Sequence, residues 1–69
     1  MAQGTINSLR TDKGFGFITS DQDRRDIFFH RNDVEGTTFD ALREGQRVEF
    51  TPEESGKGPR AGEIRLIEN

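Results

Sequence analysis

Two short segments of this chain place aromatic side chains at every second position. Residues 13–18 read Lys-Gly-Phe-Gly-Phe-Ile, and residues 26–30 read Asp-Ile-Phe-Phe-His. Because successive side chains of an extended strand point to opposite faces, Lys13, Phe15 and Phe17 share one face of the first segment. Phe28 and His30 share one face of the second segment by the same rule. Flat rings beside a cation can stack on the bases of single-stranded nucleic acid, so the spacing predicts a stacking surface.

The opposite faces of these two segments indicate which side is the core. Two glycines of the first segment offer nothing to bury there, so the apolar side chains on that side are Ile18, Ile27 and Phe29. If these three form the core, the aromatic face lies in water, which is a costly surface unless a ligand covers it. The alternative buries the aromatic face and exposes the other three side chains. We favour the first arrangement, since one thin sheet cannot bury both sets.

The charges are distributed unevenly along the chain. The net charge of −3 argues mildly against nucleic-acid binding, which usually requires a basic surface. The distribution matters more than the sum, and the acidic residues cluster in segments expected to be turns. The cations that fall in or beside the aromatic segments are Arg10, Lys13, Arg31, Lys57 and Arg60. This pattern predicts a local positive rim on an acidic body.

Length and composition exclude several classes of protein. With 69 residues the chain is long enough for one small domain, which we take as residues 1–69. It has no cysteine and one histidine, so a disulfide is impossible and a structural zinc site is not expected. No nucleophile–base constellation is evident, and we expect neither enzymatic activity nor a cofactor. There is no signal-peptide pattern or membrane-length apolar run, and we expect a cytoplasmic protein.

The elements that would position the aromatic face are short strands. We expect five extended segments, at residues 4–10, 15–20, 26–30, 46–51 and 60–67, with a polar turn at 21–25 and a loop at 52–59. Residues 32–42 read as irregular, with one helical turn possible after Thr38. Five short strands without a long helical period predict an all-β domain, a small antiparallel barrel or sandwich.

The two aromatic segments resemble the ribonucleoprotein motifs of the bacterial cold-shock proteins and of the related Y-box domain. The resemblance extends over nearly the whole chain, including the Glu-Gly-Gln turn at residues 44–46 and the Lys-Gly-Pro loop at residues 57–59. It implies a five-stranded antiparallel OB-fold barrel that binds single-stranded DNA and RNA with little sequence preference. Such proteins act as RNA chaperones in the stress response and affect transcription and translation. We expect a monomer.

The resemblance also implies roles for individual aromatic residues. Phe15, Phe17 and Phe28 match the central stacking rings of the family, and His30 matches the motif histidine that stacks on or contacts the strand. Phe39 matches an aromatic residue that stacks on a further base, although packing over the barrel end is an equal alternative.

Charged positions carry further implied roles. Lys13 matches a motif lysine near the phosphates, and Asp26 matches an acidic position that contacts a base edge. Lys57 and Arg60 fall in the loop and at the strand start that flank the binding groove.

The chain departs from the family pattern at two stacking positions. The family usually carries Lys-Trp-Phe-Asn where residues 7–10 read Asn-Ser-Leu-Arg, so Ser8 replaces a tryptophan, and Arg31 replaces a second aromatic residue. Each base–aromatic stack is worth roughly 1–3 kcal/mol, so we expect affinity about one to three orders of magnitude below that of a typical member. Arg31 and Arg10 can recover part of this loss, and binding should then depend more on salt.

A protein-interaction domain is the alternative function, because exposed rings can also dock on a protein partner. The charges around the rings discriminate between the two. Nucleic acid is favoured if Arg10, Lys13 and Arg31 surround the rings, and a protein partner is favoured if Asp12, Asp26 and other acids dominate that face.

Overall fold

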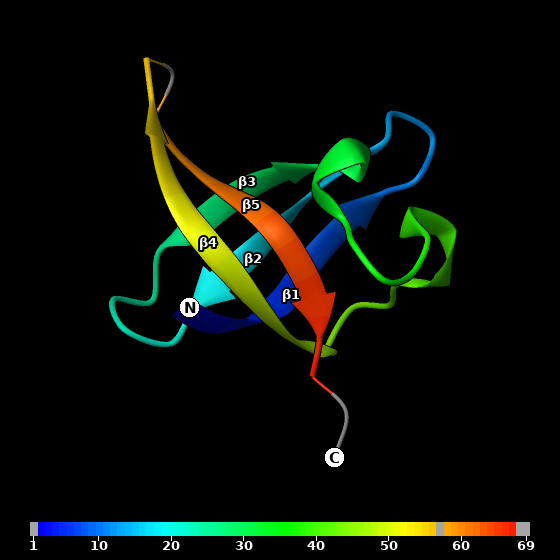
Figure 1. The fold of residues 1–69 in the computed structure, drawn as a ribbon, viewed down its shortest axis with the longest axis horizontal. Helices are drawn as coiled ribbons and strands as arrows, with labels where there is room; N and C mark the ends of the chain where they lie inside the picture. The colour runs from blue at the N-terminus through cyan, green and yellow to red at the C-terminus, as the bar shows by residue number, and fades with distance from the viewer. Residues whose placement is uncertain (1, 57, 68–69) are drawn as a thin grey trace.

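A computed structural model of the chain describes residues 2–56 and 58–67 as a closed five-stranded barrel (Figure 1). The strands follow one another around the barrel in the order β1-β2-β3-β5-β4. Their bounds are β1 (Ala2–Arg10), β2 (Phe15–Ser20), β3 (Asp26–His30), β4 (Arg47–Ser55) and β5 (Gly58–Leu66). Two short 3-10 helices, η1 (Arg31–Asp33) and η2 (Phe39–Ala41), lie between β3 and β4.

The strand predictions are confirmed for the two aromatic segments, where β2 and β3 have the expected bounds. The first strand starts two residues earlier than expected, and the predicted loop at 52–59 is wrong. In the structure β4 extends to Ser55 and β5 begins at Gly58, with Pro52 opposite Ala61 and Ser55 opposite Gly58. Proline, serine and glycine favour turns locally, but pairing between two adjacent strands outweighs that local preference.

Closure of the barrel uses one parallel contact. The described strand pairs are antiparallel except β3 with β5, whose paired Cα atoms belong to Phe28 and Arg60. The helical turn expected after Thr38 is present as η2, but the Thr38 side chain makes no capping hydrogen bond. The 3-10 helix η1 lies where we expected irregular chain.

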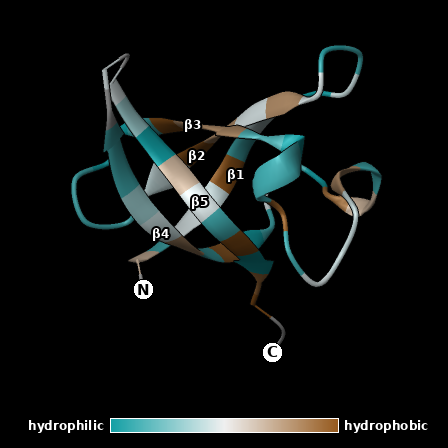
Figure 2. Cartoon of the chain, turned by 45° about the horizontal axis from the view of Figure 1, so that its top comes forward, coloured by the Kyte–Doolittle hydropathy of each residue, from teal (hydrophilic) through white to brown (hydrophobic). Residues whose placement is uncertain are grey.

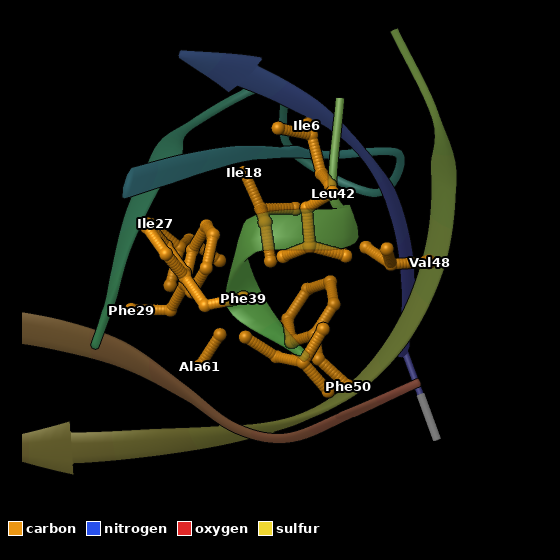
Figure 3. Close-up of a cluster of buried hydrophobic side chains, with 10 residues drawn as sticks. Ile6, Ile18, Ile27, Phe29, Phe39, Leu42, Val48, Phe50 and Ala61 are labelled. Atoms are coloured by element: carbon orange, nitrogen blue, oxygen red, sulfur yellow. The ribbon is translucent and has the colours of Figure 1, made fainter. Parts of the chain in front are cut away.

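The core lies inside the barrel and contains the side chains that the strand alternation assigned to it (Figure 3). Ile18, Phe29 and Phe50 are fully buried, and Ile27 is 6% exposed. The buried hydrophobic side chains are Ile6, Ile18, Ile27, Phe29, Phe39, Leu42, Val48, Phe50, Ala61 and Ile64. Leu66 is partly buried and packs against this cluster.

Gly16 explains why the inner face of β2 carries so little side chain. A Cβ atom at this position would lie 2.7 Å from the carbonyl oxygen of Ser8 and 2.9 Å from the ring of Phe29. Real Cβ atoms essentially never come this close to their neighbours. The glycine therefore lets the large ring of Phe29 fill the space directly beneath β2.

Outside the core, an ion pair fastens the turn after β2 to the start of β4. Arg47 donates hydrogen bonds to both carboxylate oxygens of Asp21, and its Nη1 also lies 3.0 Å from the Oγ1 of Thr5. The hydrogen bond from Arg47 holds the pKa of Asp21 below its ordinary value of 3.8.

The two shorter connections are polar. Figure 2 shows the turns after β1 and β2 as hydrophilic, whereas the longer connection between β3 and β4 also carries hydrophobic stretches. In the part of the chain that the structure describes, no helix is long and apolar enough to cross a membrane.

Candidate nucleic-acid interface

Three phenylalanine rings meet on the outside of the barrel, over β2 and β3. The pairing of these strands sets Phe17 opposite Phe28 and Phe15 opposite His30. The ring centroids of Phe15 and Phe28 lie 5.5 Å apart, those of Phe17 and Phe28 lie 5.9 Å apart, and those of Phe15 and Phe17 lie 6.0 Å apart. We call these three rings the aromatic triad. Each ring is half-buried, so the triad presents a continuous aromatic surface to solvent, as the alternation predicted.

The turn between β1 and β2 brings cations to one end of the triad. Arg10 pairs with Phe15 across the two strands, and the exposed Lys13 lies in the turn itself. Gly14 adopts a φ of +76°, and its carbonyl oxygen accepts a hydrogen bond from the backbone N–H of Arg31. A Cβ atom on Gly14 would lie 3.1 Å from Cδ of Arg31, so the arginine side chain packs directly over this glycine. The structure thus gathers Arg10, Lys13 and Arg31 near the Phe15 end of the triad.

His30 is held by hydrogen bonds at the same end. Its Nδ1 accepts a hydrogen bond from the backbone N–H of Asn32, and the backbone N–H of His30 donates to Oδ2 of Asp33. Because Nδ1 acts as an acceptor, the proton of the neutral imidazole is on Nε2. The ring therefore offers an Nε2–H donor beside the triad.

The other end of the triad is polar and acidic. Asp26 lies opposite Thr19, and its Oδ1 accepts hydrogen bonds from the Thr19 hydroxyl at 3.1 Å and from Nδ2 of Asn7 at 3.3 Å. The two hydrogen bonds fix the orientation of the carboxylate. Such a carboxylate can accept a hydrogen bond from the amino group of a base.

Arg60 also lies beside the triad but, unlike the other cations there, it is paired with an acid. It is the partner of Phe28 across the β3–β5 contact, and it forms an ion pair with Asp33. Arg10, Lys13 and Arg31 form no ion pair with any residue in the described ranges. Three unpaired cations therefore lie near the rings. The exposed acids beside them are Asp12 in the same turn and Asp40, which lines one hollow with Gly14 and Arg31, and Asp26 lies at the far end of the triad. Cations at the Phe15 end of the triad are what phosphate binding requires.

The structure does not bring every predicted residue to this surface. Phe39 is 7% exposed, and its ring packs 6.1 Å from that of Phe29, so packing is the role that the structure shows. Lys57 lies outside the described residues.

Sequence reasoning missed Asn7, Thr19 and Asp33 as neighbours of the interface. Thr19 follows Phe17 by two residues and was detectable from the strand alternation alone. Asp33 lies three residues after His30, the spacing of a capping box, which is a recognisable signal. Asn7 had no such signal, because its position depends on an irregularity in the β1–β2 register between Ile6 and Ser8.

No group of three or more metal-ligating side chains occurs among the residues that the structure describes.

Known proteins are similar to this chain in sequence and in fold. A family model described as the 'Cold-shock' DNA-binding domain matches residues 2–67. "Probable cold shock protein A" of Mycolicibacterium smegmatis is 42% identical over 97% of this chain and 100% of its own length. "Major cold shock protein" of Streptococcus pyogenes is 44% identical over 97% of this chain and 98% of its own. The solved structure "drosophila Unr CSD456" matches with a TM-score of 0.79 at 29% identity, covering 97% of this chain and 26% of that longer chain.

Proposed function

This chain belongs to the 'Cold-shock' DNA-binding domain family, and from that premise we propose that it binds single-stranded DNA and RNA by stacking bases on the aromatic triad. The observation that carries the proposal is the contiguity of the three rings on the outside of β2 and β3. Rings in this arrangement would be a poor surface for a protein that kept them in water. Bases can cover them irrespective of sequence, because every base has a flat π-face.

The polar groups around the triad have complementary roles in this proposal. Arg10, Lys13 and Arg31 attract the phosphates at one end, where Arg31 can also lie flat against a base. His30 donates from Nε2 to a base or phosphate, and Asp26 accepts from a base amino group at the other end.

The proposed affinity is lower than that of a family member with a full set of rings. Ser8 pairs with Phe17, so the missing tryptophan would have extended the triad toward β1. Arg31 stands at a second position where the family carries a ring, and each lost stack weakens binding by roughly 1–3 kcal/mol. The remaining affinity then rests more on Arg10, Lys13 and Arg31, and its salt dependence is correspondingly large.

At the cellular level, we propose an RNA chaperone of the cytoplasm that works as a monomer. Weak, sequence-tolerant stacking suits this role, because a chaperone must release the strand after melting local RNA structure.

The test is a titration of fluorescently labelled oligothymidine, followed by anisotropy at a low and a high salt concentration. The unchanged protein should bind saturably, and more weakly at high salt. The Phe15→Ala, Phe28→Ala double variant should lose nearly all binding while it stays folded. Absence of binding by the unchanged protein, or binding indifferent to the double substitution, would contradict the proposal and favour a protein partner for this face.

A further inference from the structure

The ion pair between Arg60 and Asp33 has a specific geometry. Nε of Arg60 lies 3.3 Å from Oδ2 of Asp33, and Nη2 lies 3.2 Å from Oδ1 and 3.0 Å from Oδ2. The carboxylate therefore holds the side edge of the guanidinium, the edge formed by Nε and Nη2. The end edge, formed by Nη1 and Nη2, points elsewhere.

Asp33 is itself held firmly. Its side chain is 16% exposed, and its Oδ2 also accepts the backbone N–H of His30 at 2.9 Å. The ion pair thus joins η1 and β5 to the end of β3. Because the carboxylate is fixed to the strand that carries Phe28 and His30, the orientation of the guanidinium relative to those rings is fixed as well.

The end edge of Arg60 remains available to a ligand. The Arg60 side chain is 40% exposed, and Nη1 has no hydrogen-bond partner among the residues described by the structure. Asp33 meanwhile offsets the charge of Arg60, which weakens its attraction for a phosphate compared with Arg10, Lys13 or Arg31. Directional hydrogen bonding is what such an arginine can still provide.

We infer that Arg60, oriented by Asp33, reads the edge of a base stacked at the Phe28–His30 end of the interface, and prefers a base that presents two adjacent acceptors. Guanine presents O6 and N7 in this way, and an arginine fork matches that pair. Cytosine presents N3 and O2 when it is unpaired. Adenine and thymine alternate donors with acceptors and cannot receive both N–H groups. Asp33 is then a positioning residue, and Arg60 a specificity-determining one.

The inference rests on the proposed function and refines it. Binding tolerates any base along most of the nucleic acid, because stacking dominates. One position on the protein prefers a particular base.

The experiment compares short oligothymidines that carry one central guanine, cytosine, adenine or 7-deazaguanine, all with the unchanged protein. The guanine strand should bind about fivefold to 150-fold more tightly than the adenine strand, the range expected of one bidentate contact. The 7-deazaguanine strand should lose most of that gain, because it lacks only the N7 acceptor. A preference for cytosine alone would support the same two-acceptor contact with N3 and O2.

Protein variants test the two side chains separately. Arg60→Lys keeps the charge but loses the fork, so the base preference should vanish while the salt dependence stays nearly constant. Asp33→Asn removes the negative charge that offsets Arg60. The base preference should therefore weaken, while overall affinity for the oligonucleotide and its salt dependence rise. Arg65→Lys is the matched control, since Arg65 lies in the same strand, pairs with Glu35 and faces Glu49 of β4.

Equal affinity for all four strands would overturn the inference and leave the proposed function intact. A base preference that survives Arg60→Lys would also overturn it. Failure of every strand to bind would overturn both.

Discussion

Phe28 and Phe29 are consecutive residues of β3, and their rings lie on opposite sides of the barrel wall. Phe29 is fully buried and packs 6.1 Å from Phe39, whereas Phe28 is half-buried and lies within 6 Å of both other rings of the triad. Because of strand alternation, Phe29, which is needed for stability, directly follows Phe28, which is proposed to bind nucleic acid.

Substitution by alanine should mainly affect stability at Phe29 and mainly affect binding at Phe28. Phe29→Ala should lower the free energy of unfolding by about 3–5 kcal/mol, because it leaves a large cavity in the core. Phe28→Ala should lower stability far less and weaken oligothymidine binding about fivefold to 150-fold, the equivalent of one lost stack. Urea denaturation and anisotropy titration of both variants measure the two effects. A Phe28→Ala variant that binds normally would contradict the assignment of Phe28 to the binding face.

Gly16 should tolerate no larger side chain. In Gly16→Ala the new methyl group would meet the Ser8 carbonyl and the Phe29 ring, so we expect a loss of about 1–3 kcal/mol in unfolding free energy. Gly56→Ala is the matched control, since a Cβ atom there would meet nothing within 4 Å. Equal denaturation midpoints for the two variants would show that the close approach of Phe29 to β2 is not needed.

Much of this fold and interface could be predicted from the sequence, because period-two alternation is unambiguous where glycines mark one face. Phe15, Phe17 and Phe28 were placed correctly for that reason. The extension of β4 to Ser55 and the start of β5 at Gly58 were not predicted, since strand pairing between β4 and β5 outweighs the turn preference of those residues. The Arg60–Asp33 contact was also beyond sequence reasoning. It joins residues 27 positions apart in the sequence. It depends on the parallel contact between β3 and β5, which no local sequence pattern indicates.

Restoring a ring beside the triad should strengthen binding. Ser8 pairs with Phe17, so the ring in Ser8→Trp would adjoin the triad from β1 and add one stack. We expect oligothymidine affinity to rise about fivefold to 150-fold. Gln3→Trp is the control, because Gln3 is an exposed position of the same strand that pairs with Glu49 instead. A similar gain in both variants would indicate that any added tryptophan binds the strand, without a special role for the position beside Phe17.

The Arg47–Asp21 ion pair should make stability depend on pH in the acid range. Arg47 holds the pKa of Asp21 below 3.8, so the contribution of this pair is present above that pH and is lost as the pH falls through the lowered value. Asp21→Asn should therefore be less stable than the unchanged protein at neutral pH, and the difference should shrink below about pH 4. Thermal denaturation across this range measures the difference.

The control for this prediction is Asp40→Asn, because the exposed Asp40 forms no ion pair with any residue in ranges 2–56 and 58–67. Its stability difference from the unchanged protein should vary less with pH. If the stability difference between Asp21→Asn and the unchanged protein stayed constant from neutral to acid pH, the ion pair would make no electrostatic contribution to stability.

The most direct test of base stacking on the triad is an NMR titration with oligothymidine that follows the phenylalanine ring protons. The chain has six phenylalanines and no tyrosine or tryptophan, so these signals can be assigned one by one. Ring protons of Phe15, Phe17 and Phe28 should shift and show nuclear Overhauser contacts to base protons, while those of the fully buried Phe29 and Phe50 should show none. Strand binding that leaves the three triad rings unchanged would contradict the account.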